Sequence, residues 1–116
     1  MLAGRYNMVC DQGSSFTRII EIKDADGVIF PLTGYTGRMQ IRRDVDATTS
    51  LMELTTANSR LTISGALGQI TLIITPAQTA ELTRSGVYDL EIVKTATGEV
   101  HKVLRGEFRV EKEVTR

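Results

Sequence analysis

Histidine and cysteine, the side chains most often used in acid–base and nucleophilic catalysis, each occur once in this sequence, as His101 and Cys10. A catalytic histidine needs a nucleophile beside it and a carboxylate that orients its ring. His101 lies instead on the outward parity of an alternating stretch, with Glu99 two residues away on the same face. We therefore expect a surface histidine. We expect Cys10 to be a small buried residue near a strand end, the functional alternative being a reactive thiol or an intermolecular disulfide.

Metal-binding patterns are incomplete. A structural zinc site requires four Cys or His ligands, and the chain has two such residues in total. The run Asp24–Gly27 is similar to the beginning of a calcium loop, but Ile29 stands where the EF-hand pattern needs glycine and Tyr35 where it needs glutamate. Asp44 and Asp46 could bind a divalent ion weakly, although two acids are ordinary in an exposed loop. The sequence predicts no metal site and no cofactor.

Hydrolysis by paired carboxylates is the remaining catalytic possibility, because the chain has 14 acidic residues. The chain has few aromatic side chains with which to build a sugar-stacking cleft, since it contains three tyrosines, three phenylalanines and no tryptophan. No glycine-rich phosphate loop follows a strand and opens a helix. We therefore expect that the protein is not an enzyme and that it has no catalytic, cofactor-binding or metal-binding residues.

The overall charge disfavours nucleic acid and membranes as partners. The 14 acidic residues are balanced by 14 basic ones, whereas nucleic-acid binding normally draws on a basic excess. The same balance disfavours anionic membrane surfaces. No apolar run approaches the roughly 18 residues that cross a bilayer, and the first six residues contain no signal-peptide core. With one cysteine and hence no internal disulfide, we expect a protein kept in solution in a reducing compartment.

Arginine and tyrosine are the candidate binding side chains. Arginine is more frequent than lysine in this chain, and its planar guanidinium pairs and stacks at protein interfaces. The alternative is that the arginines serve solubility and protect edge strands. The row Arg105, Glu107, Arg109 and Glu111 would suit either cross-strand ion pairs or register-setting against a partner chain. The residues predicted to anchor a protein interface are Tyr6, Tyr35, Arg38, Arg42 and Arg43.

Half-buried β-strands must position these side chains, because the dominant hydrophobic period of the chain is two. Apolar and polar residues alternate in residues 15–23, 38–42, 61–64, 69–75 and 87–94, and again in 99–111. The last strand is expected to face inward at Val100, Leu104, Phe108 and Val110, and to bend or bulge at Gly106.

Turn residues separate these strands. Asp24–Gly27, Gly65–Gly68 and Thr95–Gly98 are typical of hairpins, and 44–50 is expected to be an exposed loop. Only residues 76–82 look helical, with Thr75 as the N-cap. Seven to nine strands with one short helix predict an all-β fold over residues 1–116. We expect a single antiparallel Ig-like or jelly-roll-like two-sheet sandwich domain with one short helical turn.

A series of short sequence motifs follows a characteristic order along nearly the whole chain. They are Tyr6–Val9, Gln12–Arg18, the Asp24–Gly27 turn, Leu32–Arg42, Gly68–Leu72, Val87–Glu91, Gly106–Val110 and Glu113–Arg116. In this order the chain resembles a group of small virion proteins of tailed bacteriophages, and its early part is similar to the N-terminal domain of phage upper-baseplate proteins. Those domains are β-sandwiches that anchor receptor-binding parts to the tail. Gly37 departs from the pattern, at a strand position where a side chain would pack better, and could indicate close approach by a neighbour.

The resemblance implies a structural role in the virion, for a chain made in the cytoplasm of a host bacterium. The predicted function is an assembly module that docks in several copies on the tail, baseplate or fibre-attachment region, with other virion proteins as partners. One alternative is a capsid decoration (cement) protein that stabilises the head shell. Another is a carbohydrate- or receptor-binding sandwich, for which an aromatic content of 5% offers few stacking residues.

Overall fold

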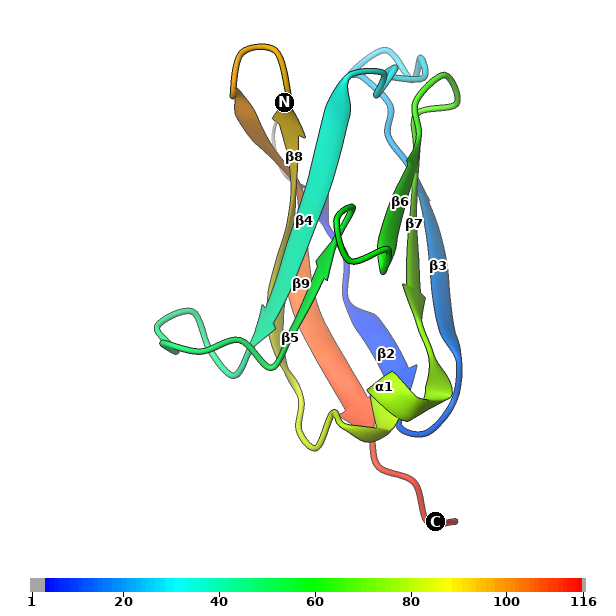
Figure 1. Ribbon diagram of the computed structural model, residues 1–116, viewed down its shortest axis with the longest axis vertical. Helices are drawn as coiled ribbons and strands as arrows, with labels where there is room; N and C mark the ends of the chain where they lie inside the picture. The colour runs from blue at the N-terminus through cyan, green and yellow to red at the C-terminus, as the bar shows by residue number, and fades with distance from the viewer. Residues whose placement is uncertain (1–3, 116) are drawn as a thin grey trace.

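Two β-sheets packed face to face make up the computed structural model, which describes residues 4–115 (Figure 1). The larger sheet has the order β1-β9-β8-β4-β5, with β2 also paired to β9; the smaller sheet has the order β3-β7-β6. This is the immunoglobulin arrangement, in which strands B, E and D face strands G, F, C and C′. The strands are β1 (Gly4–Arg5), β2 (Met8–Asp11), β3 (Phe16–Glu21), β4 (Tyr35–Arg42), β5 (Met52–Thr55), β6 (Leu61–Ser64), β7 (Gln69–Ile74), β8 (Gly86–Lys94) and β9 (Val100–Glu111).

The predicted inner faces are confirmed for the central strands. Met39 and Ile41 of β4 are buried, as are alternate residues of β7 and β8. The side chains that they bury meet between the two sheets, where each fully buried aliphatic side chain stabilises the fold by about 1.5–3 kcal/mol. Gly37 faces the same core, and a Cβ there would overlap the Leu61 side chain of β6. The close neighbour of Gly37 is therefore the chain's own second sheet.

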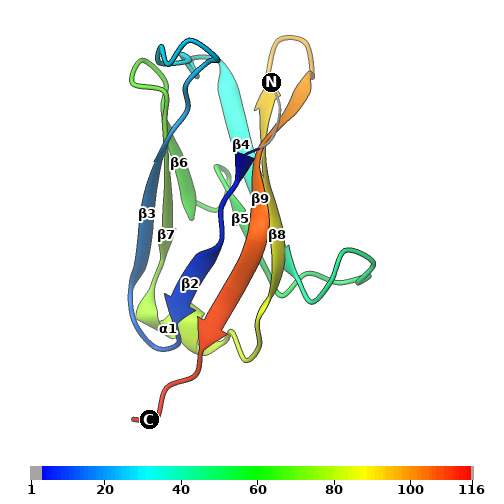
Figure 2. The same cartoon turned by 180° about the vertical axis from the view of Figure 1, so that it is seen from behind.

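The N-terminal strands break the antiparallel pattern expected from the sequence. β1 and β2 pair with β9 in parallel, with Gly4 opposite Leu104 and Met8 opposite Phe108. Between them the backbone runs against Gly106, whose missing side chain leaves room for the Tyr6 carbonyl. The strands therefore reach the larger sheet from the same end at which β9 begins (Figure 2).

A β-bulge lies in β9, but not where the sequence predicted it. Leu90 of β8 pairs with Leu104, and the next residue, Glu91, pairs with Lys102. Val103 is consequently the extra residue of the bulge, and its side chain is buried. Of the predicted bend or bulge at Gly106, the bulge is absent, because Gly106 is in regular register opposite Tyr88.

The bulge reverses the side-chain alternation in the first part of β9. Val100, predicted to face inward, is 44% exposed. His101, predicted to face outward, lies opposite the buried Ile92 and so shares its face. The glycine at 106 was a plausible place for the irregularity, but the actual site depends on the pairing with β8, which the alternation of one strand does not reveal.

The expected turns and helix are present, but three short strands lie outside the predicted alternating ranges. Residues 24–27, 65–68 and 95–98 close hairpins, each with a glycine at positive φ. Helix α1 (Pro76–Ala80) begins at the predicted N-cap Thr75, whose hydroxyl accepts the Gln78 N–H at 3.3 Å. Within residues 4–115, no helix is long and apolar enough to cross a membrane. The predicted alternating ranges did not include β1, β2 or β5, which are two, four and four residues long.

Candidate functional site

The residues with the greatest catalytic potential lie apart in the structure, and the cysteine is buried. Cys10 is fully buried, and burial raises the pKa of its thiol to about 11, so the nucleophilic thiolate is scarce at neutral pH. It pairs with Val110, at the opposite end of β9 from His101. His101 instead lies beside Glu99, with 3.4 Å between Nε2 and Oε2. The chain therefore places no cysteine within reach of its histidine.

The aspartates of the calcium-like run stabilise a turn. Asp24 Oδ1 accepts the backbone N–H groups of Asp26 and Val28 at 2.9 and 3.0 Å. Asp44 Oδ1 accepts the N–H of Asp46 at 3.1 Å in the same way. Among residues 4–115 no group of three or more Asp, Glu, His or Cys side chains is arranged to hold a metal ion. These carboxylates therefore act as turn residues.

The outer face of the larger sheet gathers the polar side chains into columns of like charge. The β4 column is basic, with Arg38 and Arg42, and the β8 column beside it is acidic, with Asp89 and Glu91. Because directly opposite residues of paired strands share a face, the β4–β8 register places Arg38 beside Glu91. On the flanking strands, Glu53 of β5 is acidic, and Lys102 and Arg105 of β9 are basic. The rest of the outward row of β9 is mixed in charge, with Glu107, Arg109 and Glu111.

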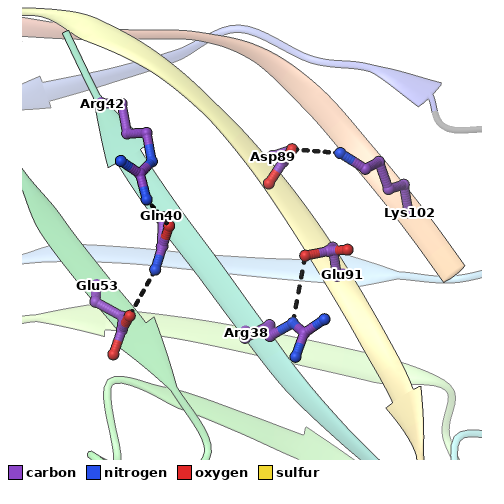
Figure 3. Close-up of polar contacts among 7 residues, drawn as sticks. All are labelled: Arg38, Gln40, Arg42, Glu53, Asp89, Glu91 and Lys102. Carbon is purple, nitrogen blue, oxygen red and sulfur yellow. Dashed lines mark hydrogen bonds and ion pairs between the residues drawn. The ribbon is translucent and has the colours of Figure 1, made fainter. Parts of the chain in front are cut away.

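Hydrogen bonds and ion pairs join neighbouring columns (Figure 3). Arg38 Nε lies 3.3 Å from Glu91 Oε1, and Lys102 Nζ lies 2.7 Å from Asp89 Oδ2. The hydrogen bond to Asp89, with its negative charge, raises the pKa of Lys102. Exposed pairs of this kind stabilise the fold by only about 0–1 kcal/mol, so they favour these side-chain positions only weakly.

Gln40 links the same face to the β5 edge. Its amide donates to Glu53 Oε2 at 2.7 Å, and its carbonyl oxygen accepts from Arg42 Nη2 at 2.7 Å (Figure 3). Arg42 Nη1 also donates to the Ala47 carbonyl at 2.8 Å. Arg42 therefore connects the sheet face to the 44–50 loop, which is exposed as predicted.

An open depression of about 800 Å³ lies over this face. Its lining combines Val87 and charged side chains of β4, β8 and β9 with Asp44 and Val45 of the loop. Val45 is 84% exposed, and the loop projects away from the sandwich beyond the larger sheet (Figure 1). The depression is thus a shallow, charged surface with an apolar side chain at its rim.

The predicted interface residues do not all belong to this surface. Arg38 and Arg42 share the outer face of the larger sheet, where Arg42 lines the depression and Arg38 does not. Arg43 follows at the strand end, paired with Asp44 at 3.1 Å. Tyr35 is half-buried and packs its ring against Phe30, with 6.2 Å between the ring centres. Tyr6 is 45% exposed, and its carbonyl accepts the Tyr88 hydroxyl. The structure therefore groups the arginines and leaves the two tyrosines elsewhere.

The acidic half of the surface was missed. Asp89, Glu91 and Glu53 were seen only as the outward residues of alternating strands, or not at all in the case of Glu53. The available signal was the outward parity of residues 87–94, which contains two acids in a row of alternate positions. Nothing in that stretch alone indicates that basic columns flank it.

Comparison with known proteins supports the fold. No family model matches the sequence, and no curated protein matches it. Among solved structures, the chain is similar to the extracellular domain of the voltage-gated sodium channel beta4 subunit, whose parallel homodimers are described as explaining its role in cell–cell adhesion. The TM-score is 0.55 and the identity 10%, over 98% of this chain and 97% of that one. At this identity the likeness shows the fold alone, an Ig-like β-sandwich.

Proposed function

We propose that this chain is a non-catalytic structural module of a bacteriophage particle, which docks on other virion proteins through the outer face of its larger sheet. The docking step rests on one observation: acidic and basic side chains alternate across β5, β4, β8 and β9 and contact one another. Placement in a phage particle rests on the resemblance of the sequence phrases to small virion proteins.

Alternating charges suit protein recognition. Side chains that already favour one rotamer lose less conformational entropy when a partner covers them. Complementary charge across an interface also sets register and excludes wrong partners. Arg38 and Arg42 supply the guanidinium groups that are enriched in such interfaces.

Sugar binding has weaker support. The one aromatic residue that lines the depression is Tyr88, which is 4% exposed and faces the core. A carbohydrate site would present an aromatic face for stacking. The lining of this depression presents charges and Val87 instead.

Mass spectrometry of purified particles tests the placement. If the chain is a tail, baseplate or fibre-attachment module, quantification against the major capsid protein should give a copy number in the tens. A copy number in the hundreds would instead indicate a cement protein on the head shell. Absence of the chain from purified particles would overturn the virion role altogether.

An Arg42→Glu variant tests the docking surface. The exchange removes the contacts to Gln40 and Ala47 at a half-buried surface position, so the fold should survive while incorporation into particles falls. Arg84→Glu is the matched control, because it makes the same charge change at an exposed residue outside the depression. Equal incorporation of both variants would remove this face as the docking surface.

A further inference from the structure

We infer that the partner seated on the outer face of the larger sheet is a second copy of this chain, packed face to face about a two-fold axis that runs parallel to the strands between β4 and β8. This inference rests on the proposed function in one respect, since it takes that face to be the docking surface. It makes the partner on that face a second copy of this chain in place of a different virion protein, and it gives the geometry of the contact.

The first argument is the order of the charged columns. From one edge of the sheet to β9 the strands follow the order β5, β4, β8, β9. The outward charges are acidic on β5, basic on β4 and acidic on β8, and the part of β9 that pairs with Asp89 and Glu91 is basic. The residues are Glu53 on β5, Arg38 and Arg42 on β4, Asp89 and Glu91 on β8, and Lys102 and Arg105 on β9. Beyond that part the outward row of β9 is mixed in charge, with Glu107, Arg109 and Glu111.

The second argument is symmetry. Rotation by half a turn about an axis parallel to the strands exchanges the two sides of the sheet and preserves height along the strands. With the axis between β4 and β8, the basic β4 column covers the acidic β8 column of the second copy, and Glu53 of β5 covers Arg105 of β9. An in-plane axis perpendicular to the strands would place each column over the same column of the second copy, so that like charges meet. Charge complementarity therefore selects one isologous arrangement.

The third argument is the register of individual residues. Arg38 is directly opposite Glu91 within the sheet, so the axis brings the Arg38 of each copy over the Glu91 of the other. One row across the four strands contains Glu53, Gln40, Asp89 and Arg105. The same rotation therefore places Glu53 over Arg105 and Gln40 over Asp89. Among residues 4–115 no carboxylate lies within ion-pair distance of Arg105, so this pairing would give it a partner.

The exposed Val45 fits the same geometry. The loop that carries it projects beyond the sheet at the end where Arg42 lies opposite Val87 (Figure 1). A second copy in the proposed position would cover the Val87 end of the face and approach the loop. This contact would remove two aliphatic side chains from water, one of them 84% exposed.

The contact area indicates a weak dimer. Four strands spaced about 4.8 Å apart, and about eight residues long, offer a face of roughly 500 Å² per copy. A stable interface usually buries about 800 Å² on each partner. Facing sheets also cross at about 30°, so the central β4 and β8 columns make the closest contacts. We therefore expect self-association that depends on concentration and weakens with salt.

Charge exchange in trans tests the inference. Arg38→Glu and Glu91→Arg each place like charges over one another in a homodimer, and each should weaken self-association by at least roughly tenfold. In an equimolar mixture, the glutamate of Arg38→Glu meets the arginine of Glu91→Arg. The second pair of the heterodimer joins the unchanged Glu91 of the first variant to the unchanged Arg38 of the second. The mixture should therefore form heterodimers that neither variant forms alone. Sedimentation velocity over a concentration series, with circular dichroism to confirm folding, measures this directly.

The outcomes separate this inference from the proposed function. Restored association in the mixture, with Arg84→Glu behaving as the unmodified chain, supports the two-fold dimer. A mixture that stays monomeric while both variants are folded would overturn it, as would an unmodified chain that is monomeric at the highest attainable concentration. If the dimer is absent and Arg42→Glu still fails to enter particles, the face docks a different protein and only the second-copy inference is lost.

Discussion

Cys10 and Tyr88 carry buried ionisable groups, and their burial links the stability of the fold to pH. Burial raises the pKa of the Cys10 thiol from 9.0 to about 11 and that of the Tyr88 hydroxyl from 10.0 to about 12. In both cases the deprotonated form is the charged one, which a buried site disfavours. The neutral forms therefore belong to the folded state, and the Tyr88 hydroxyl uses its proton to bond the Tyr6 carbonyl.

The free energy of unfolding should fall as pH rises above about 9. Because the pKa of each group is higher in the folded state, its contribution to the free energy of unfolding is complete at a pH below its pKa in the unfolded state. That contribution is lost as the pH rises through its pKa in the folded state. The thiol contribution should therefore disappear between 9.0 and about 11, and the hydroxyl contribution between 10.0 and about 12. Each is on the order of 2–3 kcal/mol. Urea unfolding at a series of alkaline pH values measures the decline.

Two variants assign the steps of this profile. Cys10→Ala should remove the part of the decline that begins near 9.0, and Tyr88→Phe should remove the part that begins near 10.0. Tyr88→Phe should also lower the free energy of unfolding at neutral pH by about 1 kcal/mol, because the bond to the Tyr6 carbonyl is lost. A profile that is flat to pH 11 in the unmodified chain would contradict the linkage.

At the scale of elements, the parallel N-terminal strands depend on close backbone contact with β9. A Cβ at Gly106 would overlap the Tyr6 carbonyl and crowd the Asn7 side chain. Asn7 Oδ1 accepts the Glu107 N–H at 3.0 Å, and the Tyr6 N–H donates to the Arg105 carbonyl at 2.9 Å. The segment between β1 and β2 is thus hydrogen-bonded to β9 on both sides of the glycine.

Gly106→Ala should therefore destabilise the protein by about 1–3 kcal/mol, because backbone must shift to admit the methyl group. Gly4→Ala is the matched control on the same pair of strands, since a Cβ there meets Leu104 at 3.4 Å, an ordinary contact. Denaturant unfolding compares the two. Amide hydrogen exchange of residues 5–10 should quicken in Gly106→Ala, and equal stability of the two variants would show that the close approach is not required.

Elements with strong alternation were predictable from the sequence, and relations between elements were not. Strands β4, β7 and β8 bury the residues that their period of two indicated. The bulge at Val103 was misplaced because it reflects the register of β9 against β8. The parallel pairing of β1 and β2 joins the two ends of the chain, and local patterns carry no information on such contacts.

The candidate surface was half predictable for the same reason. Arg38 and Arg42 could be singled out by residue type and parity, since both are outward residues of one strand. The carboxylate that pairs with Arg38 lies 53 residues further along the chain. Its place became clear only when the β4–β8 register was known. Tyr35 was chosen by residue type alone, and it packs on Phe30 instead of standing free.

For the molecule as a whole, a charged side chain bridges the two sheets along one side of the sandwich. β2 and β3 are the neighbouring edges of the two sheets, and the chain passes directly from one to the other (Figure 2). Arg18 of β3 donates to the Val9 carbonyl of β2 at 3.0 Å, and its guanidinium carbon lies 4.5 Å from the centre of the Phe16 ring. The arginine that interrupts the inner parity of β3 therefore bridges the sheets at their open edge, with its charge facing solvent.

The core between the sheets should decide whether the molecule folds at all. Leu90 of β8 is fully buried, so Leu90→Asp would place a carboxylate among aliphatic side chains without a partner. The cost should exceed about 4 kcal/mol, close to the whole stability of many small domains. Ile19→Asp makes the same kind of exchange on β3 at a side chain that is 64% exposed, and should cost less than about 1 kcal/mol. Circular dichroism with thermal unfolding should show Leu90→Asp unfolded and Ile19→Asp melting within a few degrees of the unmodified chain. A cooperative transition in Leu90→Asp near that of the unmodified chain would contradict a core built on the inner face of β8.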